Sequence, residues 1–315
     1  MPLLAPRHHE LAVPDLSERR ILLTGGSDGI GLAIATRLAA AGADLVLPVR
    51  NPSKGRIAVD RILAEHPQAR ITLETLDLAS LASVAELADK LTADGAPIHG
   101  LVNNAGLMTP PERRTTTDGF EVQLGTNHLG HFALTGRLLP LLRAGHARVT
   151  TQTSIAAKRG SIAFDDLQHE RDYDTMAAYR QSKIAGGIFG LELSRRSRER
   201  GWGITSTLAH PGVAPTNLLA AQPGVGRPED TREVRLIRAL SRRGLMVGTV
   251  ESASLSALMA ATSPDAVDGG FYGPQWPGDA GGPPGPTSLW KPLRDDAAAR
   301  RLWEVSEELT GVTYA

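Results

Sequence analysis

The feature that most constrains this chain is a regular alternation of short apolar runs with helical patterns. The apolar runs predict strands at residues 21–23, 44–49, 71–76, 98–103, 148–153 and 204–208. The patterns between them predict helices over 29–41, 56–66, 81–91, 121–143 and 174–200. Strands that alternate with helices form a parallel sheet, and right-handed crossovers place the helices on both of its faces. We therefore expect an α/β, doubly wound parallel sheet of about seven strands in a single domain, 1–315.

The alternation loosens after Pro211. Residues 213–247 contain short helical pieces without a strand, and an insertion here would lie above the carboxyl ends of the strands, where ligands bind. We expect a substrate lid at about 213–247. Residues 273–292 are rich in glycine and proline and lack periodicity, so they predict an irregular surface segment. It opens an irregular tail, 273–315, in which only 295–309 has a helical pattern.

Charge and composition exclude several classes of protein. Lys+Arg and Asp+Glu number 34 each, so no net charge favours nucleic acid or an anionic membrane as a partner. The absence of cysteine excludes disulfides, thiolate zinc sites and a cysteine nucleophile. No apolar run approaches the roughly 20 residues that span a bilayer, and prolines interrupt the first 20 residues, unlike the apolar core of a signal peptide. We expect a cytoplasmic protein without a membrane partner.

A glycine-rich turn, TGGSDGIG at residues 24–31, directly follows the first predicted strand. Gly25 permits a tight turn, while Gly29 and Gly31 let the backbone approach a pyrophosphate and let the following helix pack on the strand. The amino end of that helix would face the negative charge. A ligand-free glycine turn is the alternative, but the strand–turn–helix context favours a Rossmann-type dinucleotide site.

The spacing of these glycines and the motifs that follow resemble the short-chain dehydrogenase/reductase family. The matching motifs, in order over about 19–265, are residues 24–31, Asp77, Asn103–Gly106, Asn127, Ser154, Tyr179 with Lys183, and Pro211-Gly212. A closer resemblance is to the retinol-dehydrogenase-like branch. It rests on the long interval between Ser154 and Tyr179, and on Asp165-Asp166-Leu167, His210-Pro211-Gly212 and Arg301–Ser306.

The end of the second predicted strand indicates which dinucleotide is bound. NAD-selective sites place an acidic residue there, whereas this strand runs into Arg50, whose guanidinium can hold a 2′-phosphate. The alternative is an ordinary exposed arginine. Pro48 cannot donate to a ladder, so we expect the strand to end or kink at that position.

The resemblance, together with Arg50, implies NADP(H) as the cofactor. The residues expected to bind it are Gly25, Ser27, Asp28, Gly29, Ile30, Arg50, Asp77, Leu78, Asn104, Ala105, Gly106, Tyr179, Lys183, Pro211, Gly212, Val213 and Thr216. Three of these assignments have structural alternatives. Asp77 and Thr216 are also suited to cap helices, and Asn104 to brace neighbouring backbone.

The catalytic residues implied by the resemblance are Asn127, Ser154, Tyr179 and Lys183. Tyr179 and Lys183 are four apart in a helical pattern and share a face. We expect the lysine ammonium to lower the tyrosine pKa, so that the phenol exchanges a proton with a substrate oxygen. Ser154 would bond the same oxygen, and Asn127 would hold a water beside Lys183. Taken alone, the tyrosine–lysine pair is also compatible with simple packing.

We expect an oxidoreductase that transfers a hydride between NADP(H) and a carbonyl or alcohol, with a bulky hydrophobic small-molecule substrate. Two alternatives are a non-catalytic dinucleotide-binding sensor or scaffold and a sugar-nucleotide epimerase or dehydratase. The first usually lacks the tyrosine or lysine, and the second usually has a shorter glycine spacing and a larger C-terminal domain. His128 and His131 lack a carboxylate partner, so no metal site is expected. Substrate identity, reaction direction, stereochemistry and oligomeric state, including a homo-oligomer, stay open.

Overall fold

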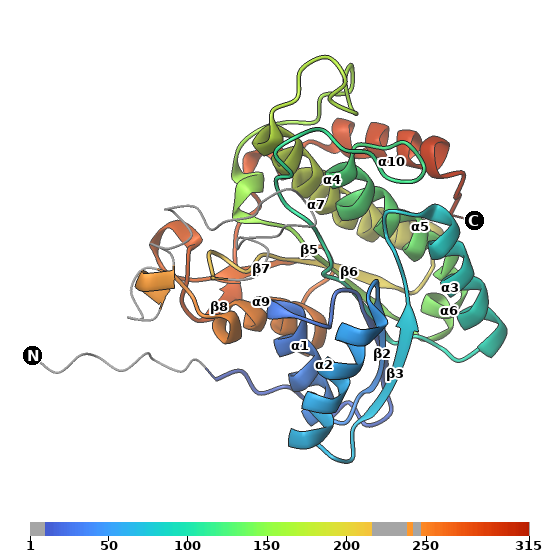
Figure 1. Ribbon diagram of the computed structural model, residues 1–315, viewed down its shortest axis with the longest axis vertical. Coiled ribbons are helices and arrows are strands. Elements are labelled where there is room, and N and C mark those ends of the chain that lie inside the picture. The colour runs from blue at the N-terminus through green and yellow to red at the C-terminus, as the bar shows by residue number, and fades with distance from the viewer. Residues whose placement is uncertain (1–9, 216–237, 242–246, 315) are drawn as a thin grey trace, which may run out of the picture.

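The computed structural model describes residues 10–215, 238–241 and 247–314, which contain one mixed sheet (Figure 1). Its eight described strands lie in the order β3-β2-β1-β4-β5-β6-β7-β8. They are β1 Arg20–Leu23, β2 Asp44–Val49, β3 Arg70–Thr75, β4 Gly100–Asn103, β5 Arg148–Gln152, β6 Thr205–Ala209, β7 Phe271–Pro274 and β8 Pro284–Pro286. All neighbouring strands are parallel except β8, which is antiparallel to β7. The predicted doubly wound fold is therefore confirmed, with one strand more than expected.

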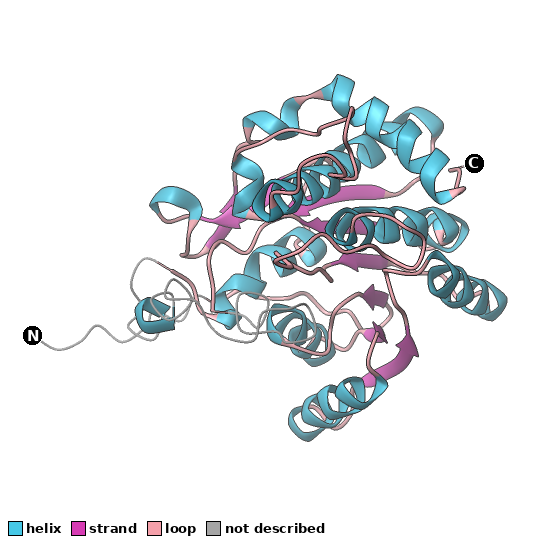
Figure 2. Ribbon diagram, turned by 45° about the horizontal axis from the view of Figure 1, so that its top comes forward, coloured by secondary structure: helices cyan, strands magenta, loops and turns pink. Residues whose placement is uncertain are grey.

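Helices cover both faces of the sheet (Figures 1 and 2). The described α-helices are α1 Gly29–Ala40, α2 Pro52–Glu65, α3 Leu81–Asp94, α4 Val122–Leu124, α5 Gly130–Arg137, α6 Leu139–Ala144, α7 Thr175–Arg200, α9 Val250–Thr262 and α10 Asp296–Thr310. Helices α1, α2 and α9 lie on one face, and α3, α5 and α7 lie on the other, with α10 packed outside α7. Four short turns join them: the π-helical turn η1 Gly125–Leu129 and the 3₁₀ turns η2 Ile155–Lys158, η4 Pro277–Asp279 and η5 Lys291–Arg294.

The strand order locates the expected ligand site. Strands β1 and β4 are neighbours, although β2 and β3 separate them in the sequence, so the direction of winding reverses between them. In sheets of this kind ligands bind beyond the carboxyl ends of the strands at this switch point. The turn at 24–31 follows β1 and the motif at 103–106 follows β4, so both lie at this point.

Strand β2 continues one residue past Pro48, to Val49, so it does not end at the proline as expected. Pro48 pairs with Glu74 of β3, whereas the pairing of β2 with β1 stops at Leu22 and Val46. The Val49 carbonyl accepts from Leu76 on the β3 side. Because successive residues of a strand face opposite neighbours, the proline nitrogen faces the side where pairing has already ended.

The C-terminal segment is more ordered than the sequence predicts. Part of 273–292 forms β8, an edge strand, where prolines are tolerated because a donor is needed only on the inner side. Beyond it, α10 buries Trp303 in an aromatic cluster with Phe132, Phe189 and Tyr314. The tail at 273–315 therefore contributes β8 and the buried face of α10 to the fold, while 275–292 is irregular apart from β8 and short 3₁₀ turns.

Two further expectations concern segments rather than single residues. Most of the predicted lid, about 213–247, lies outside the described residues, and so does Thr216. In the part of the chain that the structure describes, no helix is both long enough and apolar enough to cross a bilayer.

Candidate active site

The glycine turn after β1 has the geometry that its sequence predicts. Gly25 has φ +71° and Gly29 has φ +51°, backbone conformations that side chains disfavour. A Cβ on Gly31 would lie 2.0 Å from the Gly25 carbonyl oxygen, so no other residue fits there. Asp28 caps α1, and no acidic residue occupies the first turn of that helix. The positive end of the α1 dipole faces this turn and suits an anionic group, although the Asp28 carboxylate at the cap accepts from Gly29 N–H at 2.7 Å and offsets part of the dipole.

Thr24 ties this turn to the loop after β4. Its buried hydroxyl oxygen accepts from the backbone N–H groups of Asn104 and Ala105, each at 3.0 Å. The Asn104 amide in turn donates to the Thr24 carbonyl at 2.8 Å, and its oxygen accepts from Gln152 at 2.9 Å. Asn104 thus braces the backbone, which is one of the two roles that the sequence left open.

Arg50 and Asp77 both lie at the carboxyl edge of the sheet. Arg50 is exposed at the end of β2. Asp77 follows β3, and its carboxylate accepts from Ala79 N–H at 3.0 Å. Ser80 is the residue that caps α3, accepting from Ser83 N–H at 3.2 Å. The capping alternative for Asp77 therefore falls away, and its half-buried side chain stays beside the expected cofactor site with Leu78.

The side chains of Lys183 and Asn127 both lie against Gly106 in the loop after β4. A Cβ built on Gly106 would lie 2.9 Å from Asn127 Oδ1 and 3.1 Å from Lys183 Nζ. Only glycine leaves this space open, so the loop can pass directly over both polar groups. Burial lowers the Lys183 pKa to about 8.

Tyr179 and Ser154 face the same site from α7 and from the turn after β5. Burial raises the Tyr179 pKa, and a side-chain hydrogen bond with Ser154 offsets this in part. The expected lowering of this pKa by Lys183 is absent. The reason is that both groups are buried, so loss of solvation dominates each of them. Ser154 also caps η2 by accepting from Ala156 N–H at 3.2 Å.

Asn127 lies in the π-helical turn η1, where the helix that leads into α5 widens. Its side chain accepts from Leu107 N–H at 2.8 Å, and it donates to the Leu107 carbonyl at 3.0 Å and to Ser182 at 2.9 Å. Asn127 therefore joins the loop after β4 to α7, one residue before Lys183. Widened turns of this kind are frequent at functional sites.

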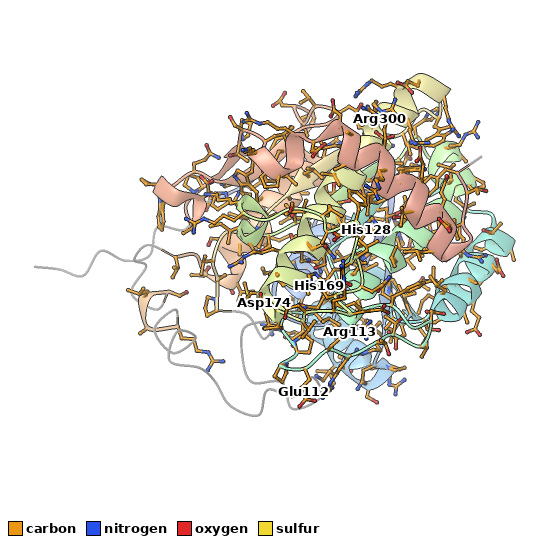
Figure 3. The ribbon with its side chains drawn as sticks, turned by 90° about the horizontal axis from the view of Figure 1, so that it is seen from above. Glu112, Arg113, His128, His169, Asp174 and Arg300 are labelled. Atoms are coloured by element: carbon orange, nitrogen blue, oxygen red, sulfur yellow. The ribbon has the colours of Figure 1, made fainter. Side chains whose placement is uncertain are left out.

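Two loops hold the amino end of α7, which carries Tyr179. The carbonyl of Pro110 accepts from the Thr175 hydroxyl at 2.7 Å in the first turn of α7. Arg113 donates to the Gln168 carbonyl at 3.0 Å, which links the loop after β4 to the segment that contains His169 (Figure 3). The long interval between Ser154 and Tyr179 thus forms a loop docked against α7.

The segment after β6 lies across the site from the glycine turn. Gly212 has φ +70°, and a Cβ there would lie 2.6 Å from the Ala280 carbonyl oxygen. Val213 N–H donates to the same oxygen at 2.8 Å. Pro211, Gly212 and Val213 are therefore positioned by the chain that follows η4.

Sequence reasoning missed two groups at this site. His131 lies between Thr24 and Asn127, and its interval of four from Asn127 in a helical pattern was the available signal. Lys158 is the last residue of η2 and forms an ion pair with Asp279 at 2.7 Å, although 121 positions separate the two in the sequence. No pattern in the sequence predicts this pair.

Of the other histidines, His128 bonds Ser306 of α10 at 2.8 Å beneath that helix (Figure 3). In the described ranges, no three His, Cys, Asp or Glu residues gather as metal ligands would.

Comparison with known proteins gives the same assignment. The family model described as short chain dehydrogenase matches residues 19–223. Retinol dehydrogenase 13 of Homo sapiens is 37% identical over 297 residues, which cover 93% of this chain and 85% of that protein. Polyprenol dehydrogenase of Mus musculus is 36% identical and covers 95% of this chain and 86% of its own length.

Solved structures agree with these relatives. An uncharacterized protein of Mycobacterium paratuberculosis superposes with a TM-score of 0.77 at 31% identity, covering 96% of this chain and 97% of that one. RhlG of Pseudomonas aeruginosa, in an active-site complex with NADP, has a TM-score of 0.61 at 26% identity. It covers 82% of this chain and 94% of its own.

Proposed function

Because this chain belongs to the short chain dehydrogenase family, we propose that it transfers a hydride between NADP(H) and a carbonyl or alcohol on a bulky, largely hydrophobic substrate. The observation that carries the proposal is the convergence of Asn127, Ser154, Tyr179 and Lys183 beyond the carboxyl ends of β4 and β5. A core assembled only for packing would not bury a lysine here, since burying a charged group is costly.

The residues at the glycine turn fit a dinucleotide. The turn has no side chain at Gly25 or Gly31, and it leads into a helix without acidic residues in its first turn. These features suit a pyrophosphate, which Ser27, Asp28 and Ile30 would contact through their backbone, and Gly29 once its N–H exchanges the Asp28 carboxylate for the phosphate. Bound there, NADP(H) would supply or accept the hydride.

Tyr179 is the proposed proton donor in carbonyl reduction, because its hydroxyl bonds Ser154 at the site and is protonated near neutral pH. It would give its proton to the substrate oxygen while the carbonyl carbon gains the hydride, and the pKa that burial raises has to be offset during this transfer. Ser154 would hold that oxygen by a second hydrogen bond. With a pKa of about 8, Lys183 is still largely protonated at neutral pH. Burial outweighs any effect of this charge on the Tyr179 pKa in the structure, so we propose that the ammonium acts on the phenolate that forms during the transfer.

Arg50 supports NADP(H) over NAD(H). It stands exposed at the end of β2, where an acidic residue would select NAD, and a guanidinium can form paired hydrogen bonds with a 2′-phosphate. Lys54 and Arg56 add positive charge in the first part of α2. We expect NADPH to bind at least several-fold more tightly than NADH, and Arg50→Ala to narrow that difference. Equal dissociation constants in the unmodified protein would contradict this preference.

The hydrophobic substrate class rests on relatives named for retinol and polyprenol. We propose retinoid and polyprenoid carbonyls as the first compounds for assay, beside small charged carbonyls as the contrasting set. Turnover confined to the small charged compounds would reject the substrate class while leaving the reaction type intact.

The deciding experiment follows NADPH consumption by absorbance with this panel, in the unmodified protein and in Tyr179→Phe. Phenylalanine preserves most of the packing but has no proton to transfer. We expect turnover to fall by about a hundredfold to ten-thousandfold, the usual contribution of a general acid, while NADPH binding survives. Lys183→Ala should weaken both turnover and binding. Near-normal turnover of Tyr179→Phe would reject the role assigned to this residue.

A further inference from the structure

We propose that His131 is a positioning residue that links the glycine turn to the catalytic Asn127 through a directional chain of hydrogen bonds. The proposal rests on the proposed function for its effect on turnover, while the chain itself can be tested without turnover. His131 lies in α5 with 2% of its surface exposed. Its Nε2 lies 3.0 Å from Thr24 Oγ1, and its Nδ1 lies 3.2 Å from the Asn127 carbonyl oxygen.

The hydrogen-bonding capacity of Thr24 determines the direction of the chain. Its hydroxyl oxygen has two lone pairs, and the N–H groups of Asn104 and Ala105 occupy both at 3.0 Å. Toward His131 the hydroxyl can therefore only donate. Its other acceptor, the Val102 carbonyl, lies farther away at 3.3 Å. His131 Nε2 is consequently the acceptor.

The same argument fixes the tautomer of His131. When Nε2 accepts, a neutral imidazole carries its proton on Nδ1, where the Asn127 carbonyl can accept it. The opposite tautomer would place two lone pairs against each other at Asn127 and leave Nε2–H facing an oxygen whose lone pairs are already used. Burial, with a smaller contribution from nearby Lys183, lowers the His131 pKa to about 4 although the hydrogen bond to the Asn127 carbonyl opposes the shift, so the ring is neutral at physiological pH.

Both ends of this chain of hydrogen bonds lie at the candidate active site. Thr24 opens the glycine turn and also holds the loop after β4. At the other end, Asn127 lies in the widened turn η1, and its side chain bonds Leu107 and Ser182 beside Lys183. A displacement of the glycine turn is therefore transmitted through one rigid ring to the residue that holds the approach to Lys183. A histidine that only filled space would not need both nitrogens paired in one direction.

The first test reads the tautomer directly. Nitrogen NMR of histidine-labelled protein, with the His131 signal assigned by its loss in His131→Asn, should show a neutral ring protonated on Nδ1 at about pH 6. Thr24→Val removes the donated hydroxyl and with it the acceptor of the Asn104 and Ala105 N–H groups, so amide spectra must first show that the fold is retained. In that variant the Nε2 resonance should move toward that of a nitrogen without a hydrogen bond. A ring protonated on Nε2, a charged ring, or an unchanged Nε2 signal in Thr24→Val would overturn the chain.

The second test measures positioning with a double-mutant cycle of Thr24→Val and His131→Phe. We expect His131→Phe to lower kcat about tenfold, with KM for the carbonyl changed less than about threefold, and to lower kcat much less in the Thr24→Val background. His131→Asn keeps an N–H close to the Nδ1 position but loses the contact with Thr24, so it should recover only part of the loss. The positioning role would be rejected if the two substitutions lowered kcat independently, so that their effects multiplied in the double variant. It would also be rejected if His131→Phe and His131→Asn lowered kcat equally.

These two tests separate failure of this proposal from failure of the proposed function. If the unmodified protein oxidises no NADPH with any carbonyl, the proposed function fails, while NMR still decides whether the chain exists. If the unmodified protein is active but the cycle is multiplicative, the function stands and the inference about His131 fails.

Discussion

The glycine turn and the C-terminal segment 276–294 border the candidate active site from opposite sides, and different interactions hold them. In the turn, Thr24 is fully buried and its bonds join backbone groups of two adjacent loops. In the C-terminal segment, Lys158 pairs with Asp279 at 2.7 Å, donates to the Gly278 carbonyl at 3.0 Å and lies over Trp290. Both side chains of that ion pair are about 30% exposed, at 31% and 29%.

This difference predicts how each region responds to change. Buried backbone contacts tolerate neither an added carbon nor a lost hydrogen bond, because the neighbours cannot move and water cannot replace them. A partly exposed ion pair can be replaced in part by water and salt. Substitutions in the glycine turn should therefore cost much stability and activity, whereas substitutions in the C-terminal segment should cost little.

Gly31→Ala is the change with the largest expected effect. Its Cβ would lie 2.0 Å from the Gly25 carbonyl oxygen and 2.7 Å from Asn104 Nδ2. We expect NADPH binding to be lost and the free energy of unfolding to fall by about 3 kcal/mol or more. Urea unfolding and fluorescence titration with NADPH would measure the two effects.

Gly186→Ala in α7 is the matched control. The Cβ at Gly186 would meet its nearest neighbour, Thr151 Cγ2, at an ordinary 3.6 Å, and alanine favours a helix interior. Its free energy of unfolding should stay within about 1 kcal/mol of that of the unmodified protein. Similar losses for the two variants would contradict the steric explanation.

Acid should destabilise both regions through buried histidines. His131 behind the turn and His210 behind the C-terminal segment have pKa values of about 4, and that of His128 is about 3, in each case because burial disfavours the charged ring. The unfolded chain, with the usual value of 6.5, therefore binds more protons than the folded one as the pH falls below 6.5. Stability is lost between about pH 6.5 and pH 4, by up to about 1.4 kcal/mol per pH unit for each ring.

Glu121 opposes this trend. Burial raises its pKa in the folded state, so as the pH falls the folded protein binds a proton at Glu121 before the unfolded chain does. Urea unfolding at a series of pH values should still show a steep loss toward acid. The slope of the unfolding free energy against pH gives the number of protons taken up on unfolding. His131→Asn and His210→Asn should each lower that number by about one. An unchanged slope in either variant would show that the ring concerned is not the buried neutral group described.

Breaking the Lys158–Asp279 ion pair should have the smallest effect. Asp279 has φ +59°, which asparagine also tolerates, so Asp279→Asn removes the charge without backbone strain. We expect a loss of about 0.5–1 kcal/mol in the free energy of unfolding, decreasing as salt is added. Lys158→Met should lose a similar amount of unfolding free energy. The double variant should lose little more than either single variant, because both remove the same ion pair. A loss as large as that of Gly31→Ala would remove the contrast between the two regions.

Much of the architecture was predictable because it depends on local patterns. The six strands located from apolar runs lie within two residues of β1 to β6 at each end, and Gly25, Gly31, Ser154, Tyr179 and Lys183 occupy the expected edge of the sheet. Strand β8 was missed because it forms an edge from prolines that have no alternating pattern. The π-helical turn was missed because it interrupts a pattern that is continuous in the sequence.

The sequence by itself determined the doubly wound fold, the glycine turn and the order of the catalytic residues, because each depends on residue types at short, regular spacings. Only the tertiary structure decided the role of His131, the ion pair of Lys158 with Asp279 and the raised pKa of Tyr179. Those features depend on burial and on contacts between residues about a hundred positions apart. Hydrogen-bond direction and desolvation arise from what surrounds a side chain, and the linear chain does not specify those surroundings until it is packed.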